Sequence, residues 1–119
     1  MMACKEGCKG CENEGLRSKA SDMESLVEYQ NEAVVSRTIL QKRAGTVTIF
    51  SFDEGEGLSE HTTPYDALVY IIDGTAEITI GKESVILKKG QMTIMPANLP
   101  HALKAIEPYK MMLVMIRSD

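Results

Sequence analysis

The sequence predicts an all-β domain, a sandwich or barrel of about eight short strands. Runs of β-branched and aliphatic residues recur between residues 33 and 116, with turn signals roughly every 8–12 residues. In the run 76–80, apolar and polar residues alternate strictly, as they do in a strand with one buried face. A chain of 119 residues is long enough for one such domain with one core, but not for two.

The first 20 residues are expected to form a flexible tail, and residues 21–119 the folded domain. The tail is rich in Lys, Glu, Gly and Ser, and Leu16 is its single large aliphatic residue. Such a segment buries too little apolar surface to offset the entropy lost on ordering.

The tail contains three cysteines, Cys4, Cys8 and Cys11. Their spacing resembles the iron–sulfur motif of radical-SAM enzymes, although this chain is too short for the βα barrel of those enzymes. Three thiolates also suit zinc, or an iron–sulfur cluster with an outside fourth ligand, and nearby lysines would favour redox-sensing thiolates. The alternative is a disordered tail with free thiols. A disulfide framework is not expected from three cysteines in a cytoplasmic chain.

A short helix is expected directly after the tail. Ser21 can cap it, because Glu24 follows at the spacing of a capping box. Met23, Leu26 and Val27 then share one face at helical spacing. The predicted helix ends near residue 30, before the strand pattern begins.

The expected strands are bounded by turn residues and cover 33–41, 46–52, 67–72, 76–80, 85–87, 91–95 and 109–116. In the second of these, the apolar alternation changes face between Ile49 and Phe50, which predicts a bulge or a strand covered on both faces. Asp73 followed by Gly74 is the strongest hairpin signal in the chain, and Gly81 marks the next turn.

The charge and hydropathy of the chain exclude several classes of function. A net charge of −4 and a pI near 5.2 argue against a nucleic-acid partner, which usually needs a basic surface. No apolar run approaches the roughly 20 residues of a membrane span, and the first residues lack the apolar core of a signal peptide. We therefore expect a cytoplasmic protein without nucleic-acid or membrane partners.

The two histidines of the chain, His61 and His101, are the main candidates for chemistry. Imidazole is a common metal ligand and changes its charge near neutral pH. Each histidine lies beside a proline-containing turn and an apolar strand, so a barrel can bring both rings into one cavity. Alternation would place Thr63 on the face of His61, and Leu103 on the face of His101. The alternative is that both are ordinary surface or hydrogen-bonded histidines.

Residues 55–74 resemble the first motif of the cupins, a family of small jelly-roll barrels. That motif reads Gly, five residues, His-x-His, three or four residues, Glu, six residues, Gly. Gly55, His61 and Gly74 fit it, whereas Thr63 replaces the second histidine and Ala67 the glutamate.

Residues 90–105 resemble the second cupin motif, which reads Gly, five residues, Pro-x-Gly, two residues, His, three residues, Asn. Gly90, Pro96 and His101 fit it, and Asn98 and Ala105 depart from it. The segment from about residue 35 to 117 is therefore similar to small single-domain bacterial cupins of undefined activity. The resemblance implies a double-sheet jelly-roll barrel, a cavity for a small ligand, and two-fold dimers that pair edge strands.

The resemblance also implies a set of metal-ligand positions, which fall on His61, Thr63, Ala67 and His101. Only the two histidines can ligate. Catalytic zinc usually keeps three protein ligands, and the non-haem iron triad needs two histidines and a carboxylate. Asp66 is the nearest carboxylate, but alternation turns it away from the face of Ala67. We therefore expect either no metal or a weakly bound divalent transition metal on His61 and His101.

These expectations favour a small-molecule-binding module with a degenerate metal site. Its pocket would be lined by residues on the inner faces of the strands: His61, Thr63, Ala67, Val69, His101 and Leu103. The alternative is a metal-dependent enzyme of the oxygenase or isomerase type that uses both histidines. A second alternative is a redox- or metal-responsive accessory protein that acts through its N-terminal cysteines. The expected partners are a small-molecule ligand and a second copy of the chain in a homodimer.

Overall fold

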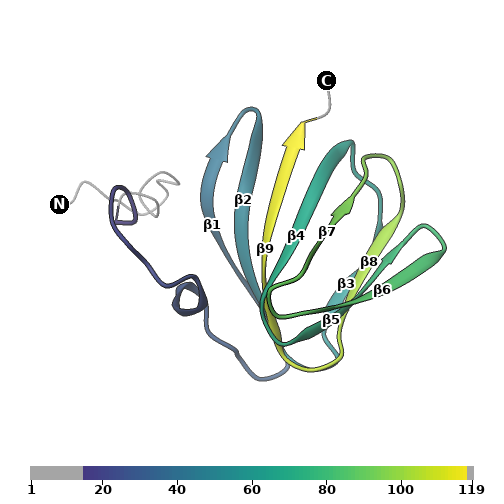
Figure 1. The fold of residues 1–119 in the computed structure, drawn as a ribbon, viewed down its shortest axis with the longest axis horizontal. Helices are drawn as coiled ribbons and strands as arrows, with labels where there is room; N and C mark the ends of the chain where they lie inside the picture. The colour runs from purple at the N-terminus through teal and green to yellow at the C-terminus, as the bar shows by residue number, and fades with distance from the viewer. Residues whose placement is uncertain (1–14, 118–119) are drawn as a thin grey trace.

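The computed structural model describes residues 15–117 as two antiparallel sheets packed face to face (Figure 1). Within these residues the strands are β1 (Val34–Lys42), β2 (Gly45–Phe52), β3 (Gly57–His61), β4 (Tyr65–Asp73), β5 (Thr75–Ile80), β6 (Glu83–Lys88), β7 (Met92–Met95), β8 (His101–Ala105) and β9 (Tyr109–Arg117). The larger sheet has the order β1-β2-β9-β4-β7, and the smaller sheet has the order β3-β8-β5-β6. The predicted all-β class is therefore confirmed.

The main core lies between the inner faces of the two sheets. From the larger sheet, Ala67, Val69 and Ile71 of β4 are buried there, as the alternation of the sequence predicts. From the smaller sheet, Ala76 and Ile78 of β5 face them. Because every second residue of a strand faces the core, this packing also fixes which side chains of β3 and β8 point inward.

Strand β2 is covered on both faces, which is one of the two outcomes that its changing alternation predicts. Ile49 is buried on the outer face of the larger sheet, whereas Phe52 is buried in the main core and stacks on Tyr109 with ring centroids 4.5 Å apart. The register irregularity of this pair of strands lies in β1, between Thr38 and Leu40, rather than in β2.

The prediction of a hairpin at Asp73 and Gly74 is wrong, because this turn leads from a strand of one sheet to a strand of the other. Strand β4 belongs to the larger sheet and β5 to the smaller, so the two strands do not pair. Gly74 has a φ of +82°, and a Cβ at this position would lie 2.0 Å from the carbonyl oxygen of Pro108. The turn at Gly81 does join two paired strands, β5 and β6.

The prediction of an N-terminal helix is also wrong, because only a single turn of 3-10 helix forms there, η1 (Met23–Leu26). Asp22, not Ser21, precedes this turn, and no side chain caps it. Val27 leaves the turn with extended backbone, φ −135° and ψ 156°. A segment this short gains little from helix formation alone, so packing against the sheet decides its path.

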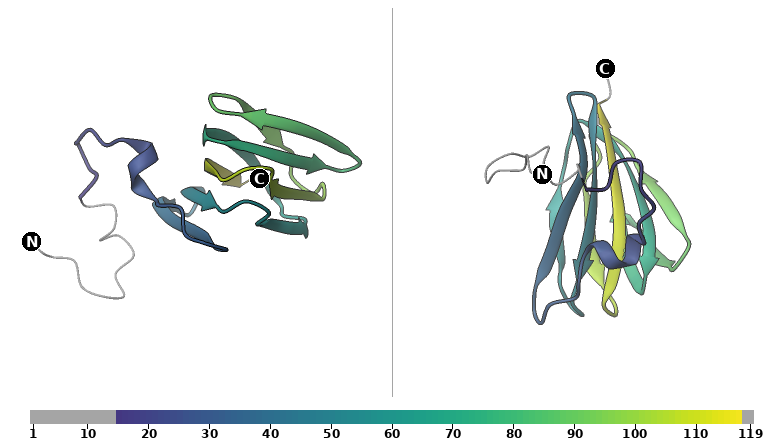
Figure 2. Two further views of the ribbon diagram at one scale, coloured as in Figure 1. Left: turned by 90° about the horizontal axis from the view of Figure 1, so that it is seen from below. Right: turned by 90° about the vertical axis from the view of Figure 1, so that its left-hand side faces the viewer.

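Residues 22–30 form what we call the N-terminal strap, which crosses the outer face of the larger sheet (Figure 2). Val27 is buried there between Ile49 and Ile72. Polar contacts fasten the strap to the same face. The Ser51 hydroxyl donates to the Glu28 carbonyl oxygen at 2.8 Å. The Lys110 ammonium donates to the Glu24 carbonyl oxygen and lies 4.9 Å from the centre of the Tyr29 ring.

The cysteine-containing part of the predicted tail, with Cys4, Cys8 and Cys11, lies outside the described residues. The division into a tail and a barrel domain therefore stays a prediction. Among residues 15–117, no helix has the length and hydropathy needed to cross a bilayer.

Candidate functional site

The two histidines, which are 40 positions apart in the sequence, lie side by side in the structure. His61 ends β3 and His101 begins β8, and the two residues are register partners in the smaller sheet. Their Nε2 atoms are 3.1 Å apart, and the rings meet edge to face with centroids separated by 4.3 Å. The two imidazoles therefore lie together, as the sequence predicts.

Each imidazole is held in place by a backbone carbonyl on its other nitrogen. His61 Nδ1 lies 2.8 Å from the carbonyl oxygen of Ser59, and His101 Nδ1 lies 3.2 Å from that of Leu99. A carbonyl oxygen can only accept, so both Nδ1 atoms must carry the hydrogen. In their neutral forms, both rings then direct an Nε2 lone pair at the other.

Two lone pairs at this distance repel each other unless a proton or another electron-pair acceptor lies between them. The two rings differ in their exposure to solvent. His101 is only 4% exposed, and its burial lowers the pKa of this imidazole below its ordinary value of 6.5. The hydrogen bond to the Leu99 carbonyl offsets part of this shift, and the neighbouring His61 lowers the pKa further. His61 is exposed to solvent. His101 therefore binds a proton less readily than a free imidazole does, and its neutral form presents the Nε2 lone pair to the His61 ring.

The histidine pair closes one end of a small apolar cavity between the sheets. The lining residues are Leu58, His61, Ala67, Met95, His101, Leu103, Met111, Leu113 and Met115. The space open to the centres of water-sized molecules is about 20 Å³. A single buried water needs roughly 10–15 Å³ on this measure, so the cavity has room for about one water and not for a substrate.

Four of the six predicted pocket residues line this cavity: His61, Ala67, His101 and Leu103. Val69 lies in the fully buried core instead. Thr63 belongs to the turn before β4, where its hydroxyl lies 3.3 Å from both the amide nitrogen and the carbonyl oxygen of Tyr65. The role of all six residues in binding a ligand stays a prediction.

The histidine pair suits part of the coordination shell of a divalent ion. Two imidazole nitrogens at about 2.0–2.1 Å from one ion, and at roughly right to tetrahedral angles, would lie about 2.8–3.4 Å apart. Within residues 15–117, no group of three or more His, Cys, Asp or Glu side chains is placed to hold a metal. Asp66 does not supply the missing ligand, since its carboxylate accepts the amide hydrogen of Ala97 at 2.9 Å. The described residues suit an ion held by two histidines, but they do not form a catalytic centre with three protein ligands.

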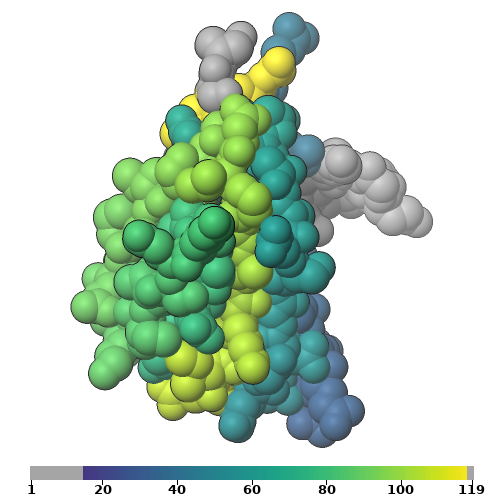
Figure 3. Space-filling view, turned by 90° about the vertical axis from the view of Figure 1, so that its right-hand side faces the viewer, coloured from purple at the N-terminus to yellow at the C-terminus, as the bar shows by residue number. Residues whose placement is uncertain are grey.

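A larger hollow lies on the flank of the molecule that carries the edge strands β6 and β7 (Figure 3). No pattern in the sequence indicates this hollow. Its lining combines residues from β5, β6 and β7 with Glu60 of β3 and the turn at residues 96–100. The apolar residues among them look like ordinary core residues in the sequence. Only the divergence of the two sheets makes them a cleft.

The fold agrees with the comparisons with known proteins. The profile of the cupin domain matches residues 48–117, which is more than half of the chain. The chain belongs to the cupin family. Of the four positions at which the motif resemblance places metal ligands, only His61 and His101 carry a ligating side chain in this cupin. No curated protein matches this cupin.

Solved structures similar to this cupin come from several bacteria. A conserved protein of unknown function from Streptococcus pyogenes is 38% identical, with a TM-score of 0.82, and the match covers 86% of this chain and 90% of that one. A cupin superfamily protein from Desulfitobacterium hafniense is 26% identical, with a TM-score of 0.81 and coverage of 86% and 94%. A cupin 2 conserved barrel domain protein from Leptotrichia buccalis is 38% identical, with a TM-score of 0.77, and the match covers 79% of this chain and 46% of that one.

Proposed function

We propose that this cupin is a small-molecule-binding module whose degenerate metal site, the pair of His61 and His101, holds a divalent transition metal only weakly. One observation carries the proposal. Both rings are anchored through Nδ1, and their Nε2 lone pairs meet at 3.1 Å. This arrangement attracts a proton or a cation, but it offers an ion only two protein ligands among the described residues.

The remaining coordination positions of such an ion would belong to water or to an oxygen of a ligand. The cavity behind the rings holds about 20 Å³, which leaves no room for a ligand on the inner side. His61 is exposed, so a ligand would approach the pair from the solvent side of this ring. The ligand would therefore be a small oxygen-bearing molecule that binds at the surface end of the cavity.

Metal analysis tests the degenerate site. After dialysis against a chelator, we expect the protein to retain far less than one equivalent of iron, zinc, manganese or nickel. Titration with Co²⁺ should then show weak binding in the wild type and none in His101→Ala. Asp66→Asn is the matched control and should bind like the wild type, because Asp66 contacts the backbone of Ala97. A full equivalent of tightly held metal after dialysis would overturn the proposal.

A metal-dependent enzyme of the oxygenase or isomerase type is the second candidate. The separation of the two Nε2 atoms, 3.1 Å, favours it, because it suits neighbouring ligands of one ion. A turnover that is lost in His101→Ala, and that one particular divalent ion restores to the chelated wild type, would support this candidate. An accessory role of the cysteines would show instead as a spectral or mass change confined to the first 20 residues.

We also propose that this cupin forms a two-fold homodimer. Its support is that the outer edges of β1 and β3 have no partner strand among residues 15–117. Open edges of this kind are common sites of pairing between copies of a chain.

A further inference from the structure

The cleft between β6 and β7 is far larger than the histidine cavity. The space open to the centres of water-sized molecules is about 910 Å³ here and about 20 Å³ beside the histidines. Pockets that bind small molecules usually enclose roughly 300–1,000 Å³. The cleft therefore has the size of a ligand site, which the histidine cavity lacks.

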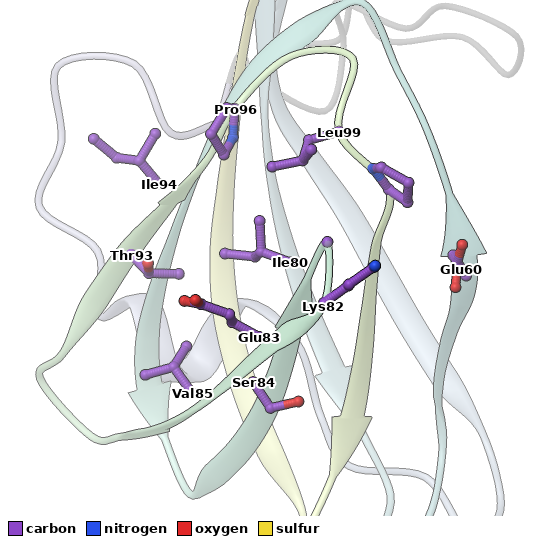
Figure 4. A pocket seen from close by; sticks show the side chains of 12 residues that line it. Glu60, Ile80, Lys82, Glu83, Ser84, Val85, Thr93, Ile94, Pro96 and Leu99 are labelled. Atoms are coloured by element: carbon purple, nitrogen blue, oxygen red, sulfur yellow. The ribbon is translucent and has the colours of Figure 1, made fainter.

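The cleft exists because one flank of the sandwich stays open. Strand β6 pairs only with β5, and β7 only with β4, among the described residues. Between these two edges, residues at the ends of both sheets line the cleft, while the rest of the inner faces stays buried. Ile80 packs against the main core and forms the floor, while Val85 and Ile94 stand on the two edges (Figure 4). Ile94 is 56% exposed, an apolar side chain without cover.

The upper wall of the cleft is a tightly held turn. Its residues 96–100 include Leu99, whose side chain lines the cleft and lies over Gly81. The amide of Asn98 donates to the carbonyl oxygen of Thr63 at 2.7 Å, and the amide of Gly81 donates to that of Pro100, also at 2.7 Å. A preformed wall of this kind costs a ligand little ordering entropy on binding.

The polar groups at the cleft favour a cation. Glu83 is the register partner of Ile80, so its carboxylate lies on the inner side of the β6 edge. Thr93 is the partner of the buried Val69, so its hydroxyl lies on the inner side of the β7 edge. In Figure 4, Glu83 points to the side where Thr93 lies, and the ammonium of Lys82 points away from it. Glu60 adds a second carboxylate at the rim.

We propose that the cleft between β6 and β7 binds a small amphiphile with a compact apolar body and one primary ammonium group. The apolar body would lie on Ile80, Val85 and Leu99, and the ammonium would donate to the Glu83 carboxylate and the Thr93 hydroxyl. This site is separate from the histidine pair, so it does not depend on whether that pair binds a metal.

The test compares three probes that share a six-carbon chain: n-hexylamine, n-hexanol and n-hexanoate at neutral pH. We expect amide resonances of β6, β7 and residues 96–100 to shift on titration in ¹H–¹⁵N NMR spectra. We also expect n-hexylamine to bind about five times more tightly than n-hexanoate, because an exposed charge pair contributes modestly. In Glu83→Gln the preference for the amine should disappear. Glu28→Gln, on the strap, makes the same change of net charge and should keep it.

Three outcomes would overturn the proposal. The first is equal binding of the three probes, or an amine preference that survives in Glu83→Gln. The second is a set of shifts confined to the histidine cavity, which would place the ligand there. The third is concentration-dependent shifts of β6 and β7 without any probe, together with a dimer in sedimentation, which would show that a second copy occupies the cleft. Glu83 is exposed, so its substitution leaves the core intact.

Discussion

His61 and His101 act as one unit, because the free nitrogen of each ring faces that of the other. Titration of one ring is therefore felt by its partner. The backbone carbonyls of Ser59 and Leu99 prevent either ring from relieving the contact by changing its tautomer.

The first prediction at the scale of single residues concerns pH. Burial lowers the pKa of His101 in the folded protein below 6.5, so below this pH the unfolded chain binds this proton more readily than the folded one. The free energy of unfolding should therefore fall as the pH drops below about 6.5. Urea unfolding of the chelated protein between about pH 5 and 8 measures this. His101→Gln should show a shallower fall, and an identical slope in both proteins would contradict the assignment.

The second prediction concerns Tyr109, whose hydroxyl is buried without a hydrogen-bond partner among the described residues. Its burial raises the pKa of this phenol, so the group stays neutral. Tyr109→Phe keeps the ring stacked on Phe52 and removes the unsatisfied group, so the free energy of unfolding should stay equal or rise by about 1 kcal/mol.

The control for this prediction is Tyr29→Phe on the strap. The Tyr29 hydroxyl donates to the Asp73 carboxylate at 2.6 Å, so its removal should lower the free energy of unfolding by about 1 kcal/mol or less. Thermal unfolding of both variants compares them. A clear loss of stability in Tyr109→Phe would mean that an ordered water satisfies the buried hydroxyl.

At the scale of elements, the turn between β4 and β5 decides the architecture. Gly74 approaches the carbonyl oxygen of Pro108 so closely that no side chain fits, and this contact joins the β4–β5 turn to the start of β9. Gly55 has nearly the same φ, +83°, but a Cβ added there would face open space. Substitutions at these two glycines therefore separate the free-energy cost of a left-handed backbone from that of a steric clash.

The prediction at this scale compares Gly74→Ala with Gly55→Ala. Gly55→Ala should cost about 1–2 kcal/mol, the usual penalty of a left-handed conformation with a Cβ. Gly74→Ala should cost about 1–3 kcal/mol more, because the added Cβ also meets backbone. Urea unfolding midpoints give both values. Equal losses would show that the turn can shift away from Pro108.

Much of this element structure is predictable from the sequence, and the failures have a common cause. The alternation of residues 76–80 predicts β5 and its buried face, because a half-buried strand imposes its period locally. The Asp73-Gly74 pair cannot reveal whether the next strand returns to the same sheet, since that depends on the partners of β5 far along the chain. The spacing of Met23, Leu26 and Val27 is likewise local, and packing of Val27 on Ile72 overrides it.

At the scale of the whole molecule, the candidate site likewise has features that the sequence predicts and features that it does not. The pairing of His61 with His101 is predictable, because a recognisable motif marks each end of the path that brings them together. Thr63 is misplaced by simple alternation, since the turn before β4 interrupts the strand at that point. The cleft is not predictable, because it arises from where two sheets end rather than from any residue pattern.

The cleft and the histidine pair are also connected through the chain. Leu99 lines the cleft with its side chain, and its carbonyl oxygen holds the His101 ring. On the opposite side, Glu60 lies at the rim between Ser59 and His61, which form the other ring contact. A molecule seated in the cleft would therefore touch both segments that orient the imidazoles.

The open β7 edge also bears on how this protein behaves at high concentration. Most natural edge strands carry a charge or a proline that discourages sheet-to-sheet growth. The sequence of β7, Met-Thr-Ile-Met, has neither, and Met92 and Ile94 are exposed on it. A partly unfolded neighbour could pair with this strand and begin a cross-β aggregate. The shortness of β7 is thus itself a protection, since four residues offer little template for fibril growth.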